Sequence, residues 1–437
     1  MQTLRKSPPH AEALLIAALV VIAILARWAG FREKTNDMSI FFSWYRELRQ
    51  AGGWRGLDTE VGNYNAPFLY LLAFTTYLPG PLIFKIKAMW VLFDVVLAFF
   101  AYRIVGLRWP NSRIPLAAAL VVVLLPTVVL NASFWGQMDA MWAAPALGAV
   151  YYLLRDKPWW GVALCGVALA VKPQGIFIFP LLLLLVLAGR IPWRTLLAAP
   201  AVFLLLDLPA IALGRNPIEL LTIYSMDRQA RNVPELSLRA PNVFALIPGG
   251  PRDDTLRTLG YLFAAAVVVG FVYVLIARAV ELTPERIVAA AALFSIMMPF
   301  LLPGMHERYF FLADVLTVVL AIFLPRFWYV PLLVQASSLI VYQPYLFARK
   351  STAPMMTIAA LLMLTAMIII GHHLLREAFR RPPVPEQPTP EQPAPEQPAV
   401  TRSAYPDKTV PHVTRQDRDR QLNPPAERPA PLPARPV

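Results

Sequence analysis

The sequence predicts an all-α, polytopic membrane protein, and three observations support this fold class. The first is composition: 57% of the 437 residues are hydrophobic, and the mean hydropathy is +0.52. The second is the single cysteine, Cys165, which lies in an apolar run and leaves no disulfide framework and no cysteine-based metal site. The third is the pattern behind the net charge of +13: Lys and Arg separate the apolar runs and form no single patch. These cations indicate membrane topology, and we expect no nucleic-acid partner.

Twelve apolar segments are candidates for membrane-spanning helices in the bilayer. The first follows Arg5 and Lys6 and has no convincing small-residue cleavage site, so we expect an uncleaved anchor. Several others are shorter than the roughly 20 residues that an untilted span needs. The segments are 11–29, 84–104, 114–131, 139–154, 158–172, 174–189, 195–213, 258–278, 287–302, 309–324, 327–347 and 354–374.

The segment 66–79 decides the topology. It is short and ends in Pro79-Gly80-Pro81, which predicts an interfacial or re-entrant element. If it does not cross, thirteen cations lie in cytoplasmic turns and six in short external turns, as the positive-inside rule expects. If it crossed, this bias would invert. Both termini are therefore expected in the cytoplasm. The loops expected on the opposite face are 30–80, 131–139, 172–174, 214–257 and 303–308.

The chain divides by composition into two parts. We predict one transmembrane domain over 1–381, with large external loops at 30–80 and 214–257. After it come the near-repeat PEQPTPEQPAPEQP and a stretch rich in Pro, Arg, Asp and Gln. Such a sequence cannot bury a core, so 382–437 is predicted to be a disordered, Pro-rich cytoplasmic tail. Its Pro motifs leave partner binding open beside a passive role.

The tripeptide His306-Glu307-Arg308 stands between two long apolar runs. Charged groups at a membrane boundary cost several kcal/mol unless they line a wet cavity. A guanidinium and an imidazole together suit an anionic group such as a phosphate. The alternative is a loop whose charges only face water.

Asp37 opens a predicted amphipathic helix over 38–50, which we expect to lie on the membrane surface. The apolar residues of its i, i+3, i+4, i+7 pattern are Met38, Phe41, Phe42, Tyr45 and Leu48. Asp37 could be the N-cap of this helix. It could also be a carboxylate held just above the bilayer to act as a general base.

Three further polar turns fall on the same predicted face. They are GNYNAP from residue 62, WGQMD from residue 135 and KPQ from residue 172, where Pro173 breaks a helix. Asp139 could be only an N-cap, and Lys172 only a cation that reaches the membrane surface. The candidate site residues in these turns are Asn63, Tyr64, Gln137, Asp139, Lys172 and Gln174.

The order of these motifs resembles the GT-C membrane glycosyltransferases. The nearest likenesses are bacterial polyprenyl-phosphate-mannose mannosyltransferases and ER dolichyl-phosphate-glucose glucosyltransferases, whose His-Glu-Lys motif is similar to His306-Glu307-Arg308. The likeness runs from about residue 11 to residue 325. The other elements that carry it are Asp37, the YPP-like turn Tyr64-Asn65-Ala66-Pro67, Trp135-Gly136-Gln137-Met138-Asp139 and Lys172-Pro173-Gln174.

The resemblance implies a GT-C fold in a bacterial cytoplasmic membrane, with the active site on the extracytoplasmic face. It also implies a lipid-linked sugar monophosphate donor, inversion at the anomeric carbon and often no metal. Position by position, Asp37 resembles the catalytic base and His306 a contact of the donor phosphate. Arg308 and Lys172 suit the same phosphate, and the remaining candidates suit the sugar and the acceptor.

We therefore expect a hexosyltransferase that moves a hexose, mannose by resemblance, from polyprenyl phosphate to a lipid-linked or cell-envelope glycan. Cations at the phosphate would stabilise the charge that develops when the glycosyl bond breaks. The sequence holds no Gly-rich nucleotide loop and indicates no cofactor or divalent metal. Two alternatives stay open: transfer to protein, and a transporter or flippase of a lipid-linked anion. The apolar-segment carboxylates Asp94, Asp207 and Asp314 keep the transporter open, although we see no internal repeat.

Overall fold

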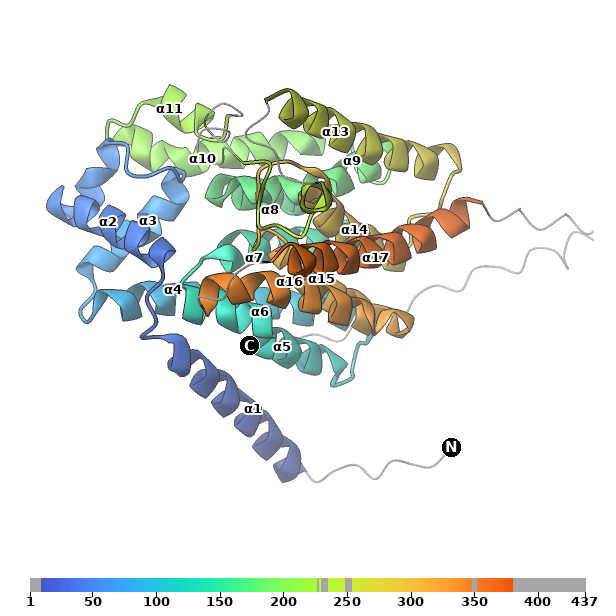
Figure 1. Ribbon diagram of the computed structural model, residues 1–437, viewed down its shortest axis with the longest axis horizontal. Coiled ribbons are helices and arrows are strands. Elements are labelled where there is room, and N and C mark those ends of the chain that lie inside the picture. The colour runs from blue at the N-terminus through green and yellow to red at the C-terminus, as the bar shows by residue number, and fades with distance from the viewer. Residues whose placement is uncertain (1–8, 226–227, 229–234, 248–253, 348–351, 380–437) are drawn as a thin grey trace, which may run out of the picture. The chain divides into compact units, whose positions relative to one another are not determined.

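The computed structural model is built almost entirely of helices, as predicted (Figure 1). It describes residues 9–225, 228, 235–247, 254–347 and 352–379, all within the unit Met1–Arg380. The predicted tail at 382–437 and parts of the loop at 214–257 lie outside the described residues.

The α-helices are α1 (Pro9–Gly30), α2 (Asn36–Gln50), α3 (Ala66–Phe74), α4 (Leu82–Arg108), α5 (Ile114–Leu124), α6 (Pro126–Val129), α7 (Asp139–Leu154), α8 (Pro158–Val171), α9 (Phe179–Leu187), α10 (Ala198–Ala212), α11 (Pro217–Thr222), α13 (Asp254–Ala277), α14 (Pro284–Leu301), α15 (Phe311–Phe323), α16 (Val330–Leu346) and α17 (Ala353–Ala378). The shorter helical turns are η1 (Gly53–Asp58), η2 (Thr75–Tyr77), η3 (Leu130–Trp135), η4 (Pro173–Ile178), η5 (Trp193–Leu197), η6 (Val243–Leu246) and η7 (Pro325–Phe327). Two short strands, β1 (Ser237–Leu238) and β2 (Met305–His306), pair in parallel.

Five helices of the described residues are long and apolar enough to cross a membrane. A sixth span results if α5 and the segment from Pro126 to Trp135, which bend by 48° at their junction, count as one. The five are His10–Gly30, Trp193–Ala212, Asp254–Ala277, Pro284–Leu301 and Ala353–Arg376. The chain is a multi-pass membrane protein, and the number of twelve spans stays a prediction.

The centre of the bundle explains why several predicted spans are short. Residues 139–151 of α7 and 311–320 of α15 are buried without exception, and the window of α14 that could span is 78% buried. These three helices pack on one another. Their apolar side chains therefore contact protein where hydropathy alone suggests lipid. By contrast, α1 lies apart from the other helices over most of its length (Figure 1).

The predicted helix at 38–50 forms as α2, but its apolar face contacts protein instead of the membrane. Met38, Phe41, Tyr45 and Leu48 are all buried. The reason is that η1 and α3, which follow in the chain, fold back against α2 and cover this face. The segment 66–79, which forms α3 and η2, therefore packs on α2.

Candidate active site

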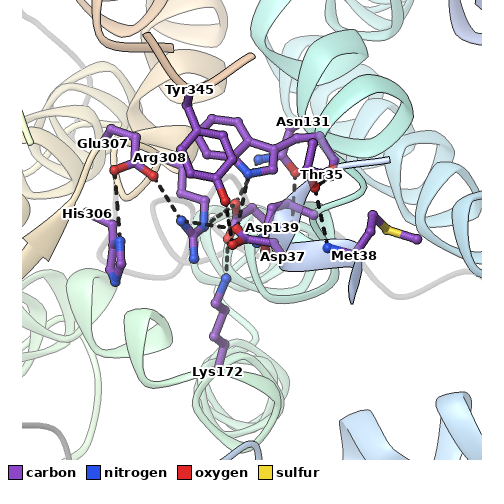
Figure 2. Close-up of polar contacts among 12 residues, drawn as sticks. Thr35, Asp37, Met38, Asn131, Asp139, Lys172, His306, Glu307, Arg308 and Tyr345 are labelled. Atoms are coloured by element: carbon purple, nitrogen blue, oxygen red, sulfur yellow. Dashed lines mark hydrogen bonds and ion pairs between the residues drawn. The ribbon is translucent and has the colours of Figure 1, made fainter. Parts of the chain in front are cut away.

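Two carboxylates from distant parts of the chain meet at one guanidinium (Figure 2). Arg308 Nη1 lies 3.6 Å from Asp37 Oδ2, and Arg308 Nε lies 3.9 Å from Asp139 Oδ2. Arg308 Nη1 also donates to Oε1 of the adjacent Glu307 at 2.9 Å. Arg308 and Glu307 are buried, so the interpretation of this tripeptide as a water-facing loop is wrong.

Neither aspartate is a helix cap. Thr35 is the N-cap of α2, because its hydroxyl accepts the backbone N–H of Met38 at 3.3 Å. The N-cap position of α7 is Met138, which makes no side-chain cap. The carboxylates of Asp37 and Asp139 are therefore free to make tertiary contacts, and the capping alternative is wrong for both.

Asp37 is held by three neutral donors. Its Oδ1 accepts the Tyr345 hydroxyl at 2.6 Å, and its Oδ2 accepts Trp135 Nε1 at 3.1 Å and the Gln137 amide. The Tyr345 and Trp135 rings stack with centroids 4.3 Å apart, which fixes both donors. Burial by itself raises the pKa of Asp37. Arg308 and the three hydrogen bonds outweigh burial and hold the pKa below the ordinary 3.8, so the carboxylate is ionised at neutral pH.

Asp139 lies deeper than Asp37. It accepts Lys172 Nζ at 2.6 Å and Asn131 Nδ2 at 2.7 Å. Asp139 and Lys172 are both fully enclosed, and Lys172 is only 1% exposed. The interpretation of Lys172 as a cation that reaches the membrane surface is therefore wrong. Lys172 and Asp139 form a buried ion pair on the inner side of Arg308.

His306 is held at the rim of the site by backbone pairing. Its strand β2 pairs with β1 in the register Leu238 to His306, and Arg239 adds an isolated bridge to His306. Burial and the nearby Arg308 lower the pKa of His306 below its ordinary 6.5, and the contact with Glu307 only partly opposes them. The imidazole is therefore neutral near pH 7 and offers a hydrogen bond, not a charge.

One cavity of about 210 Å³ opens onto this cluster. Its walls also carry the aromatic rings of Phe41, Trp44, Tyr224 and Tyr309. Seven of the nine predicted site residues line it: Asp37, Asn63, Tyr64, Gln137, Gln174, His306 and Arg308. The other two, Asp139 and Lys172, lie behind Arg308 and do not line the cavity.

Sequence reasoning missed Tyr345 and Asn131 as parts of the site. Tyr345 lies in the apolar run 327–347, more than 300 residues from its partner Asp37, and nothing local marks it. Asn131 ends another apolar run, and only its spacing of eight residues to Asp139 could have pointed to their contact. Among the residues described, no three His, Cys, Asp or Glu side chains gather closely enough to share a metal ion. The expectation of a metal-free reaction stays a prediction.

The fold of the protein is similar to that of a solved membrane protein, and this similarity gives its fold class. The structure is similar to the crystal structure of ArnT from Cupriavidus metallidurans bound to undecaprenyl phosphate, with a TM-score of 0.51 and 16% sequence identity. The match covers 83% of this chain and 77% of ArnT, so the protein has a GT-C fold, as the motifs predicted.

The family is set by sequence. The model of glycosyltransferase family 87 matches residues 63–303, more than half of the chain, and the protein belongs to that family. It is a membrane glycosyltransferase, and the transporter alternative is wrong. No curated protein matched the chain.

Proposed function

We propose that this glycosyltransferase moves a hexose, with mannose as the expected sugar, from a polyprenyl-phosphate donor to a lipid-linked or cell-envelope glycan. The reaction takes place on the extracytoplasmic face of a bacterial cytoplasmic membrane and inverts the anomeric carbon. One observation carries the proposal: an ionised carboxylate, Asp37, lines the same cavity as the phosphate-binding candidates His306 and Arg308. The undecaprenyl phosphate bound to the similarly folded ArnT supports a donor of this chemical class.

The phosphate contacts suit the leaving group. A polyprenyl-phosphate sugar is a phosphodiester with one negative charge, and cleavage at the sugar leaves a monoester with more. Arg308 meets that charge with a planar guanidinium, and the neutral His306 donates one hydrogen bond. Both contacts strengthen as the bond breaks, which lowers the barrier more than it favours substrate binding.

Asp37 suits the role of general base. The acceptor hydroxyl attacks the anomeric carbon from the face opposite the phosphate. The new C–O bond forms, the electrons of the broken bond leave with the phosphate, and the hydroxyl proton passes to Asp37. Among the described residues, Tyr345 is the sole donor to Oδ1, which leaves a lone pair of that oxygen for the proton. Trp135 and Gln137 occupy Oδ2.

The cavity walls suit a sugar ring. Phe41, Trp44 and Tyr64 offer flat apolar faces for the carbon side of a pyranose. Asn63 and Gln174 place amide groups along the same cavity, where they can donate to and accept from sugar hydroxyls. These contacts suit a hexose.

The test uses the purified full chain in lipid nanodiscs with radiolabelled polyprenyl-phosphate mannose and a bacterial glycolipid extract. We expect label to enter the glycolipid, and Asp37→Asn to abolish transfer while donor binding persists. The control is Asp58→Asn, which removes an exposed carboxylate of the same loop that does not line the cavity. Normal transfer by Asp37→Asn would assign the base elsewhere, with Asp139 as the next candidate. Label on protein instead of glycolipid would establish the protein-acceptor alternative.

A further inference from the structure

Lys87 is a fully buried cation near the start of α4, with 0% exposure. Its Nζ makes three short hydrogen bonds to backbone carbonyls, Gly30 O at 2.8 Å, Glu33 O at 2.6 Å and Ser133 O at 2.6 Å, and a longer one to Phe134 O at 3.5 Å. No carboxylate of the described residues lies within ion-pairing distance of it. The three protons of the ammonium thus all go to main-chain oxygens.

Two of the carbonyls that bind Lys87, those of Gly30 and Ser133, belong to the ends of helices. Gly30 is the last residue of α1, and Ser133 lies in the last turn of η3, whose C-terminal carbonyls carry partial negative charge. Such carbonyls compensate a buried ammonium that would otherwise cost several kcal/mol. Glu33 lies between α1 and α2, four residues before Asp37. Lys87 therefore ties the segment that leads to Asp37 to the segment that leads to Trp135 and Gln137.

We call these contacts of Lys87 with the two segments the clamp. Trp90, about one turn further along α4, adds another contact to it. Its Nε1 donates to Gly136 O at 3.1 Å, between Trp135 and Gln137. Gly136 has a φ of +76°, and a Cβ there would come within 2.1 Å of Met38 Sδ and 3.3 Å of Lys87 Cε. The turn that carries the donors of Asp37 is thus squeezed between α4 and the first turn of α2, with room for glycine only.

We propose that Lys87 is a positioning residue of the active site. Through its three carbonyl contacts it fixes the distance between the 30–37 segment and the 131–137 segment, and so keeps Trp135 and Gln137 bonded to Asp37. Lys87 does not line the cavity, so it acts through these segments and not on the substrate. The catalytic part of this inference rests on the proposed function, whereas the structural part does not.

The structural part is tested by amide hydrogen exchange of the full chain in nanodiscs. Lys87→Met keeps an unbranched side chain of nearly the same length and removes the ammonium. We expect faster exchange in 30–37 and 131–138, and unchanged exchange in α14. The matched control is Lys85→Met on the same helix, whose Nζ binds the Tyr45 hydroxyl and Leu78 O, each at 3.0 Å, outside the site. Unchanged exchange in both segments would overturn the proposal.

The catalytic part is tested by a double-mutant cycle. We expect Lys87→Met to lower kcat by about 100-fold with the donor KM nearly unchanged, since a displacement of about 1 Å can cost that much. In a Trp135→Phe/Gln137→Leu background, which keeps Asp37 and has already lost both donors that Lys87 is proposed to position, the same substitution should cost nothing more. Equal losses in both backgrounds would overturn the positioning role.

Two further variants keep the outcome readable. If Lys87→Met does not fold, Lys87→Gln, which retains two amide protons, is measured in the same two assays with smaller effects expected in the same direction. Trp90→Phe keeps an aromatic ring against Phe68 and removes the bond to Gly136, so the faster exchange should centre on 131–138. A wild-type protein that transfers no sugar would refute the proposed function, and the exchange experiment would still decide the clamp.

Discussion

Two ion pairs of this protein have similar chemistry and different surroundings. Arg27 and Asp94 join α1 to α4 at 3.0 Å, with side chains only 7% and 1% exposed, and neither lines the cavity of the candidate site. Arg308 and Asp37 lie 3.6 Å apart, with side chains 9% and 18% exposed, and both line a cavity. The first pair fastens a helix that otherwise makes few contacts. The second has an open side, and this access, not burial or charge, separates a candidate site from a structural bond.

The largest expected effect falls on Arg308 and Asp37, the open pair that lines the cavity. Arg308→Ala should lower turnover by about 10²–10³-fold, the usual cost of one lost donor at a developing charge. Arg308→Lys should lose less, because the charge remains and only the planar fork disappears. Steady-state transfer assays measure both, with thermal unfolding as the control for folding. Near-normal turnover in Arg308→Ala would leave the open pair without a catalytic meaning.

For Arg27 and Asp94, the closed pair, substitutions should change the free energy of unfolding instead of the turnover. Asp94→Asn leaves the Arg27 charge buried and uncompensated, which costs about 3–5 kcal/mol of unfolding free energy. The double variant Arg27→Met/Asp94→Leu should recover most of that loss, because it removes both charges. Transfer per folded molecule should stay normal in both variants. A folded Asp94→Asn protein without activity would contradict the division between the two pairs.

The pH dependence sharpens the account of Asp37. Its pKa is held below 3.8, and the base must be ionised, so activity should persist down to acid pH and fall only as the pH drops through this lowered pKa. Tyr345→Phe removes one hydrogen bond to the carboxylate, raises its pKa and should move the acid limb upward. We also expect about tenfold less activity, the cost of one hydrogen bond to a charge. An unmoved limb would mean that another group sets it.

The smallest perturbation tests on which face the open pair lies. Cys165 is the sole cysteine and is buried, so single introduced cysteines can be read against a low background. Asp58→Cys should react with an impermeant thiol reagent from outside intact cells, and Lys157→Cys should react only after permeabilisation; both positions are exposed. Residue 62 is a poor choice, because Gly62 has a φ of +67° and Trp44 fills the space beside it. The reverse labelling pattern would refute the proposed topology.

The polar turns and their order could be read from the sequence because each interrupts an apolar run. Seven of the nine residues chosen from these turns line one cavity. The partners could not be read in the same way. Tyr345 is one tyrosine in an apolar helix, and only the tertiary fold brings it to Asp37. Lys87 is one of the six cations predicted to lie in short external turns, since a sequence does not tell whether a cation at a helix end faces water or backbone carbonyls.

The difference between the twelve predicted spans and the five long apolar helices of the described residues also arises because a sequence does not show what covers a segment. Hydropathy measures how apolar a segment is and not what covers it. The short helices α7 and α15 are as apolar as spans, but neighbouring helices enclose them. The bend between α5 and α6 falls at Pro126, which lacks the N–H that a continuous helix needs at that point. A proline in an apolar run thus signals a break whose angle only the packing determines.

Arg308 contacts Asp37 and also lines the cavity, so in the proposed reaction it couples the basicity of Asp37 to the charge on the leaving phosphate. At rest the guanidinium helps to keep Asp37 a weak base. As the sugar–phosphate bond lengthens, the growing charge on the phosphate competes for that same guanidinium. Asp37 then loses part of its compensating charge, and its affinity for a proton rises at the moment when the acceptor hydroxyl must release one. Asp37 therefore stays a weak base until the sugar–phosphate bond begins to break, which protects the donor from premature attack by water.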